Sequence, residues 1–162
     1  AKKITTEYPD VFFLFIGKAT FKQEHMGEEI KQMAEDSLPS EKYHFAGFYE
    51  DVAKPLSAMD MLAFPSYHES FGNVLLEAMS MKVPVVAAKG GGVPDIIQHK
   101  QNGFLVEPRD ADSLYSGLKY TLDHPEESSV WIENAHKTVQ ENFTFEGFMK
   151  NLTDLYSTLL NS

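Results

Sequence analysis

The sequence predicts an α/β fold, a doubly wound parallel sheet followed by a helical tail. Short apolar runs alternate with helix-like segments through the first two thirds of the chain. This rhythm is typical of β-α-β units with helices on both faces of a parallel sheet. After the last apolar run the chain shows only helical patterns.

Five apolar runs are expected to form the strands. Three of them are nearly continuous in apolar residues instead of alternating with polar ones, which favours strands covered on both faces. The runs are residues 11–16, 43–46, 61–64, 83–88 and 103–106.

Helical periodicity predicts four helices between these strands and three after them. Pro55 and Pro125 stand near helix starts, where a missing N–H costs nothing, and Gln101-Asn102-Gly103 reads as a turn. Trp131 and the aromatic residues of the tail (Phe143, Phe145, Phe148 and Tyr156) are expected to be core contacts. The predicted helices are 26–36, 55–59, 73–81, 94–98, 111–122, 125–142 and 145–160.

The amino-acid composition excludes several classes of function. The chain has 162 residues and 43% hydrophobic content, which suits one globular domain with a core. Its net charge of −10 argues against a nucleic acid partner, because phosphate backbones require clustered positive charge. The absence of cysteine excludes disulfides and thiolate metal sites and fits a reducing cytoplasm. The six histidines show no metal-ligand spacing.

The ends of the chain give two further expectations. No apolar run approaches the roughly 20 residues that span a bilayer, and the N-terminus lacks the apolar stretch of a signal peptide. Because the sequence begins without Met, we expect it to be a piece of a longer protein, and the absence of cysteine leads us to expect a cytoplasmic one.

Ligands of doubly wound folds bind beyond the carboxyl ends of the strands, so four strand-to-helix loops matter most. Two lysines that follow the first strand, Lys18 and Lys22, would either neutralise phosphate or remain ordinary solvated residues. Glycines 90–92 in the fourth loop would either contribute to function or serve only the conformation of the turn. The loops are residues 17–20, 47–50, 65–72 and 89–92.

The segment 61–79 reads as strand, loop and helix, with Gly72 at the helix start. Backbone N–H groups there would suit a pyrophosphate. Glu77 would lie roughly 7 Å along the helix and lean back within reach of a ribose. Glu69, in the loop before the turn, would face a sugar. Alternatively, Glu69 caps the helix and Glu77 is a solvated or salt-bridged surface residue.

Glu69 and Glu77, with seven residues between them, resemble the E-x7-E signature of retaining family-4 glycosyltransferases. Further segments continue the resemblance in family order over nearly the whole chain. The resemblance implies a Rossmann-like domain, the C-terminal and donor-binding half of a GT-B enzyme. The matching segments are residues 13–17, 45–48, 64–66, 83–88, 91–97, 102–106 and 110–118.

The resemblance also implies roles for individual residues. Glu69 would be the catalytic group and contact hydroxyls of the donor sugar, while Glu77 would accept hydrogen bonds from the ribose. The nucleotide base would lie against the loop of Gly47, Phe48 and Tyr49, with an aromatic face for stacking. Backbone N–H groups would line the sugar at Ser70, Phe71 and Gly72 and meet the phosphates at Asn73 and Val74.

Partners follow from the same resemblance. The intact enzyme would move a hexose from a nucleoside-diphosphate sugar to a hydroxyl of a glycan or lipid. No metal or other cofactor is implied. Membrane attachment in this family, where present, usually involves the other domain, so a membrane-peripheral location is compatible.

Two parts of the family pattern are missing. One is the N-terminal GT-B domain. The other is the first strand of this domain, which in the family normally lies between the strands that match 11–16 and 61–64. A loop whose Arg and Lys hold the diphosphate follows that strand in the family. Residues 1–10 resemble the end of the helix that comes after this loop. We therefore expect the isolated chain to be inactive and expect self-association through unpaired sheet edges.

Two other functions remain open. A sugar-nucleotide epimerase or a phosphorylase shares the GT-B architecture. A non-catalytic interaction module with flavodoxin-like topology would show the same strand and helix pattern without binding nucleotide.

Overall fold

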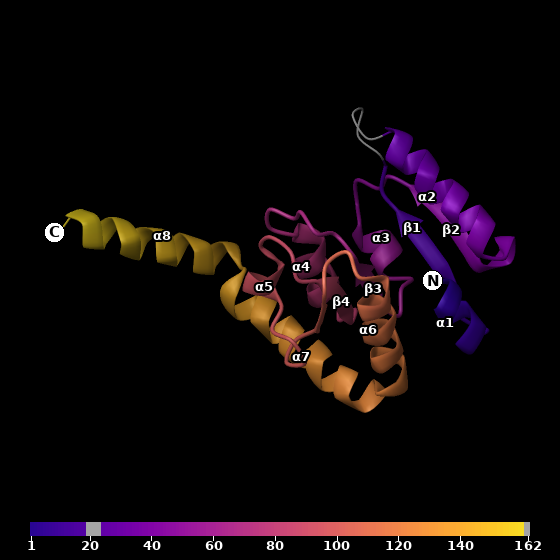
Figure 1. Ribbon diagram of the computed structural model, residues 1–162. Helices are drawn as coiled ribbons and strands as arrows, with labels where there is room; N and C mark the ends of the chain where they lie inside the picture. Colours follow the sequence, from indigo (N-terminus) through magenta and orange to yellow (C-terminus); the bar gives the residue numbers. More distant parts are fainter. Residues whose placement is uncertain (19–23, 161–162) are drawn as a thin grey trace. The chain divides into compact units, whose positions relative to one another are not determined.

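The computed structural model describes residues 1–18 and 24–160 (Figure 1). They form two compact units, Ala1–Pro55 and Leu56–Ser162, which we treat separately. Each unit carries one sheet, and every strand pair in both sheets is parallel.

The first unit pairs its two strands in parallel, with Phe13 opposite Tyr43 and Phe15 opposite Phe45. Aromatic side chains hold the pair together, since the rings of Phe15 and Phe45 stack with centroids 4.6 Å apart. Its elements are α1 (Lys2–Glu7), β1 (Phe13–Ile16), α2 (Glu24–Ser37), the short 3-10 helix η1 (Ser40–Lys42), β2 (Tyr43–Gly47) and α3 (Ala53–Leu56), whose last residue begins the second unit.

The second unit has a three-stranded parallel sheet in the order β3-β4-β5. All four residues of the central strand are buried, so both of its faces are covered. The elements are β3 (Leu62–Phe64), α4 (Asn73–Ser80), β4 (Val85–Ala88), α5 (Val93–Ile96), β5 (Phe104–Val106), α6 (Ala111–Asp123), α7 (Pro125–Asn142) and α8 (Phe145–Leu160).

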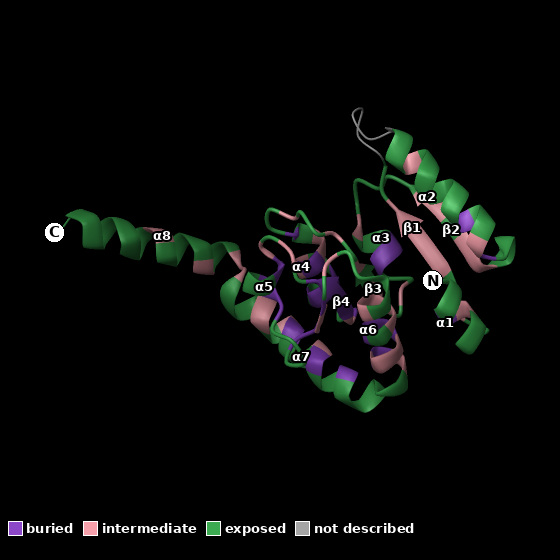
Figure 2. Ribbon diagram, in the orientation of Figure 1, coloured by how far each residue is buried: buried purple, intermediate pink, exposed green. Residues whose placement is uncertain are grey.

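The core of this unit surrounds β4 (Figure 2). Helix α6 approaches the sheet closely at Gly117, where an added Cβ would lie 2.6 Å from Val106 Cγ1 and 2.9 Å from Val86 Cγ1. Helix α4 contributes Leu75 and Met79, both fully buried. The carboxyl ends of the strands therefore belong to a tightly packed sheet, which fixes their positions.

The predicted elements are confirmed, with boundaries that differ by a few residues. The chain has an α/β fold with parallel strands and a helical C-terminal tail. Within the described ranges, β1 is an edge strand of the first sheet and β3 an edge strand of the second. The predictions of a single domain and of self-association through the edges stay predictions.

The aromatic residues of the tail correct one expectation. Trp131 is buried and stacks on Tyr120, as predicted. Phe145, Phe148 and Tyr156 are 72%, 59% and 59% exposed, so their assignment to the core was wrong. Helical spacing gathers them on one apolar face of α8, and no residue of that helix is buried (Figure 2). None of the described helices is both long and apolar enough to cross a membrane.

Candidate functional site

The segment with Glu69 and Glu77 folds as strand, loop and helix. β3 ends at Phe64, residues 65–72 form a loop that we call the Glu69 loop, and α4 begins at Asn73. Gly72, the N-cap residue, has φ 94° and ψ 53°, a left-handed conformation that favours glycine. A Cβ there would also lie 2.9 Å from Leu75 Cδ1, so any side chain would disturb the helix start.

Helix α4 begins without a side-chain cap. The carboxylate of Glu69 accepts no hydrogen bond from the described residues, so the reading in which Glu69 caps this helix is wrong. The first N–H groups of a helix have no intrahelical acceptor, and those of Asn73 and Val74 belong to this first turn. Asn73 is exposed and Val74 is half-buried. This terminus therefore has the groups that an anion requires.

Both carboxylates are available to a ligand. Glu69 is half-buried in the loop, and Glu77 is exposed on α4. Among residues 1–18 and 24–160, no side chain forms a hydrogen bond or an ion pair with either carboxylate. The salt-bridged reading of Glu77 thus finds no partner in this part of the chain. Ser70 and Phe71, between the two, are exposed.

The loop after β4, residues 89–92, packs directly against the Glu69 loop; we call it the glycine loop. The N–H of Gly92 donates to the carbonyl oxygen of Glu69 at 3.0 Å. Cβ atoms added at Gly90, Gly91 and Gly92 would lie 2.5, 1.9 and 2.6 Å from backbone oxygens of residues 67, 69 and 70. Glycine is required at these positions because the backbones of the two loops approach each other closely. The sequence alone had left open whether these glycines serve function or only the conformation of the turn.

A third loop reaches the same region and was missed by sequence reasoning. Arg109, in the loop between β5 and α6, places its guanidinium over the ring of Tyr67, with Cζ 4.1 Å from the centroid. The rule that ligands bind at the carboxyl ends of strands applies equally to β5, so residues 107–110 should have been included.

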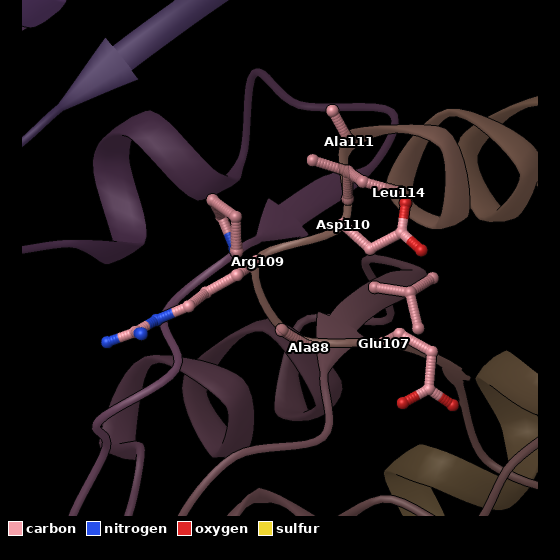
Figure 3. Close-up of a pocket in the computed structure, with 8 residues that line it drawn as sticks. Ala88, Glu107, Arg109, Asp110, Ala111 and Leu114 are labelled. Atoms are coloured by element: carbon pink, nitrogen blue, oxygen red, sulfur yellow. The ribbon is translucent and has the colours of Figure 1, made fainter.

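A pocket of about 250 Å³ lies beside this contact, at the carboxyl ends of β3, β4 and β5 (Figure 3). The side chain of Arg109 points away from the carboxylates of Asp110 and Glu107 (Figure 3). The lining residues are Pro65, Ala88, Val106, Glu107, Arg109, Asp110, Ala111 and Leu114.

The predicted base-binding residues lie in the first unit. Gly47 ends β2 with φ 74°, and Phe48 and Tyr49 are 59% and 37% exposed. The loops after β1 and β2 meet, because Gly17 N–H donates to Gly47 O at 2.8 Å and Lys18 Nζ lies 4.6 Å above the Phe48 ring. Lys22 lies outside the described residues.

The structure thus brings the predicted residues together in two groups. Glu69 to Val74 and Glu77 are contiguous in the second unit, and Gly47 to Tyr49 gather beside Lys18 in the first.

Comparisons with known proteins identify the family of the chain. A family model described as glycosyl transferases group 1 matches residues 1–138. N-acetyl-alpha-D-glucosaminyl L-malate synthase of Bacillus anthracis is 31% identical over 131 residues, covering 81% of this chain and 34% of that protein. The chain spans 24–40% of the length of the curated relatives it matches.

Two solved structures show the same architecture. Anabaena HepE, in complex with UDP and glucose, superposes with a TM-score of 0.86 at 26% identity over 95% of this chain and 42% of HepE. The C-terminal domain of the group 1 family protein LpcC from Francisella tularensis gives 0.78 at 25% identity over 90% of this chain and 76% of that one. The chain therefore belongs to the glycosyl transferases of group 1 and has the GT-B fold of their C-terminal domain.

Proposed function

We propose that this chain is the donor-binding domain of a retaining glycosyltransferase. The intact enzyme transfers a hexose from a nucleoside-diphosphate sugar to a hydroxyl of a glycan or lipid. The observation that carries the proposal is the Glu69–Glu77 segment. It joins the start of α4 at a left-handed Gly72 to two carboxylates that have no side-chain partner among the described residues, in a chain of this family.

The relatives support the donor class. HepE has been solved with UDP, with UDP and glucose, and with UDP-glucose. Relatives matched by sequence are named as an N-acetyl-alpha-D-glucosaminyl malate synthase and as D-inositol 3-phosphate glycosyltransferases. Because these enzymes differ in acceptor, the shared domain is more informative about the donor than about the acceptor.

In the proposed mechanism the diphosphate binds the N-terminus of α4. The N–H groups of Asn73 and Val74 donate to phosphate oxygens, and the helix dipole favours the negative charge. This stabilisation grows as the diphosphate leaves and charge develops on it, so it lowers the barrier as well as binding the donor. The chain has a net charge of −10, so local dipoles matter more here than overall attraction.

The two carboxylates act as acceptors for hydroxyl groups. Glu77 accepts hydrogen bonds from the ribose, while Glu69 accepts them from the donor sugar and is the catalytic carboxylate of this domain. The N–H groups of Ser70, Phe71 and Gly72 line the sugar. Fixing the sugar against the diphosphate places the reacting bond in a productive orientation, which is a large part of what positioning contributes to catalysis.

The first unit contributes the base site. Phe48 offers an exposed ring beside Lys18, and Gly47 and Tyr49 flank it. A nucleobase stacked on this loop gains from aromatic contact at modest entropic cost. The N-terminal GT-B domain of the intact enzyme supplies the acceptor site, and the protein works in the cytoplasm.

Titration of the intact enzyme with UDP, GDP and ADP tests the proposal, followed by assays of donor hydrolysis and transfer. We expect tight binding of one diphosphate and turnover only with its sugar derivative. Dependence on inorganic phosphate, or acceptor-free interconversion of the sugar nucleotide, would instead support a phosphorylase or an epimerase. Absence of nucleotide-dependent NMR shifts around residues 69–77 would support the interaction module.

The isolated chain gives a second test. We expect it to bind nucleotide weakly and to transfer no sugar, because the acceptor domain and the basic diphosphate loop of the family lie outside it. Sugar transfer by this polypeptide alone would contradict that part of the proposal.

A further inference from the structure

We propose that the glycine loop is the positioning element for Glu69: it fixes the backbone from which the carboxylate reaches the donor sugar. The inference rests on the proposed function for the role of Glu69 in catalysis. It adds Gly91 and Gly92 to the machinery as positioning residues that touch neither substrate nor reacting atoms.

The contact between the two loops is made by backbone on both sides. Gly92 N–H donates to Glu69 O at 3.0 Å. A Cβ at Gly91 would lie 1.9 Å from that same oxygen and 3.2 Å from Glu69 N, and one at Gly92 would lie 2.6 Å from Ser70 O. No residue with a side chain fits either position unless the Glu69 loop moves.

Gly91 is restricted for a second reason. Its φ of 55° is left-handed, a conformation in which the Cβ of an L-residue crowds the following carbonyl oxygen. At Gly92 no such restriction applies, because its φ is −80°. Substitutions at the two positions therefore separate the steric effect from backbone strain.

The glycine loop is itself anchored in the core. Its first residue, Lys89, donates its N–H to Val106 O at 2.9 Å and pairs its side chain with Glu107. Immediately after it, Val93 and Ile96 of α5 are 0% and 1% exposed. Because both ends are fixed, a clash between the loops displaces the more exposed Glu69 loop.

Glu77 is held by other means. It belongs to α4, whose Leu75, Ala78 and Met79 are fully buried. The close approaches of the three glycines are to residues 67, 69, 70 and 71, all before the helix. A disturbed glycine loop should therefore displace Glu69 and leave the ribose contact in place, which separates turnover from nucleotide affinity.

Kinetics of the intact enzyme with Gly91→Ala and Gly92→Ala test this separation. We expect kcat for transfer to fall by about 10²-fold, the loss typical of a displacement near 1 Å. The Kd for UDP, or for whichever diphosphate the wild type prefers, should change by less than about threefold. Gly92→Ala keeps the test valid if the strain at Gly91 prevents folding.

Gly103→Ala is the matched control. Its Cβ would lie 3.1 Å from Ile97 Cγ2 and 3.2 Å from Val85 O, at the amino end of β5 and away from the Glu69 loop. This variant should lower Tm while kcat stays within about twofold of wild type. A wild-type kcat in both glycine-loop variants, or a Kd that weakens in step with kcat, would overturn the inference.

Amide hydrogen exchange gives a readout that does not depend on catalysis. Gly92→Ala should speed exchange in residues 65–72 but not in residues 73–80, and Gly103→Ala should spare both segments. Unchanged exchange in 65–72 would overturn the inference even if activity fell. If the wild type neither binds a nucleotide nor transfers sugar, the proposed function fails, while exchange still decides whether the glycine loop fixes the Glu69 loop.

Discussion

The ring of Phe71 lies edge-on against the ring of Phe143, with centroids 6.1 Å apart and an interplanar angle of 63°. Phe71 belongs to the Glu69 loop, and Phe143 is the C-cap residue that follows α7, two positions before α8 begins. The loop that carries the proposed catalytic carboxylate is thus also in contact with the junction between the last two helices.

Phe143→Ala should loosen the Glu69 loop. Edge-to-face ring pairs contribute about 0.5–1.5 kcal/mol beyond the area that they bury, so we expect the free energy of unfolding to fall by about 1–2 kcal/mol. Urea unfolding measures this change. Phe145→Ala is the control, because Phe145 is 72% exposed and should change stability by no more than about 0.5 kcal/mol. Equal losses in the two variants would contradict a role for the ring pair.

The two glutamates should have separable effects in the intact enzyme. Glu69→Gln should lower kcat by about 10²–10³-fold, a loss typical of removing one group that stabilises developing charge or fixes the sugar. Glu77→Gln should mainly weaken donor binding, by about 10-fold, because it removes the charge from a hydrogen-bond acceptor of the ribose.

Steady-state kinetics with a matched surface variant measure both effects. Glu126→Gln removes an exposed carboxylate in the first turn of α7 and should leave both kcat and KM unchanged. Negligible effects of both Glu69→Gln and Glu77→Gln would show that the roles assigned to them are wrong.

Helix α6, which carries one wall of the pocket, depends on its N-cap. One carboxylate oxygen of Asp110 accepts hydrogen bonds from the N–H groups of Asp112 and Ser113, both at 2.9 Å. Asp110→Ala should therefore cost about 1 kcal/mol of unfolding free energy, and Asp110→Asn much less, since asparagine is an equally good cap. Thermal or urea unfolding of the pair distinguishes loss of the cap from loss of the charge alone.

The sequence predicted the parts of this structure that have a local pattern. Short apolar runs located the strands, and Gly72 marked the helix start, because these signals lie within one element. The bond between Gly92 and Glu69 joins residues more than twenty positions apart through backbone, and no side-chain pattern encodes it. The helical periodicity of residues 145–160 predicted that α8 has an apolar face. Periodicity alone does not say whether other residues of this chain pack against that face.

We expect His99 to make the stability of the second unit depend on pH. Its Nδ1 accepts a hydrogen bond from Leu105 N–H at 3.0 Å, and its ring stands against Phe104 with centroids 4.6 Å apart. Burial lowers the pKa of His99 below its ordinary value, and the positive charges of Lys100 and Lys89 lower it further. The neutral imidazole is therefore the form that the folded chain prefers.

The sign of the pH effect follows from this pKa. In the unfolded chain the imidazole takes up a proton near pH 6.5, while the folded chain resists until the pH is lower. The unfolded state thus binds more protons as pH falls below about 6.5, so the free energy of unfolding is constant above that pH and decreases below it. Urea unfolding between pH 5 and 8 measures the decrease. His99→Gln removes the titrating group and should flatten the curve in this window, because glutamine keeps an acceptor without binding a proton. Parallel pH curves for the wild type and the variant would show that His99 is not the source of the dependence.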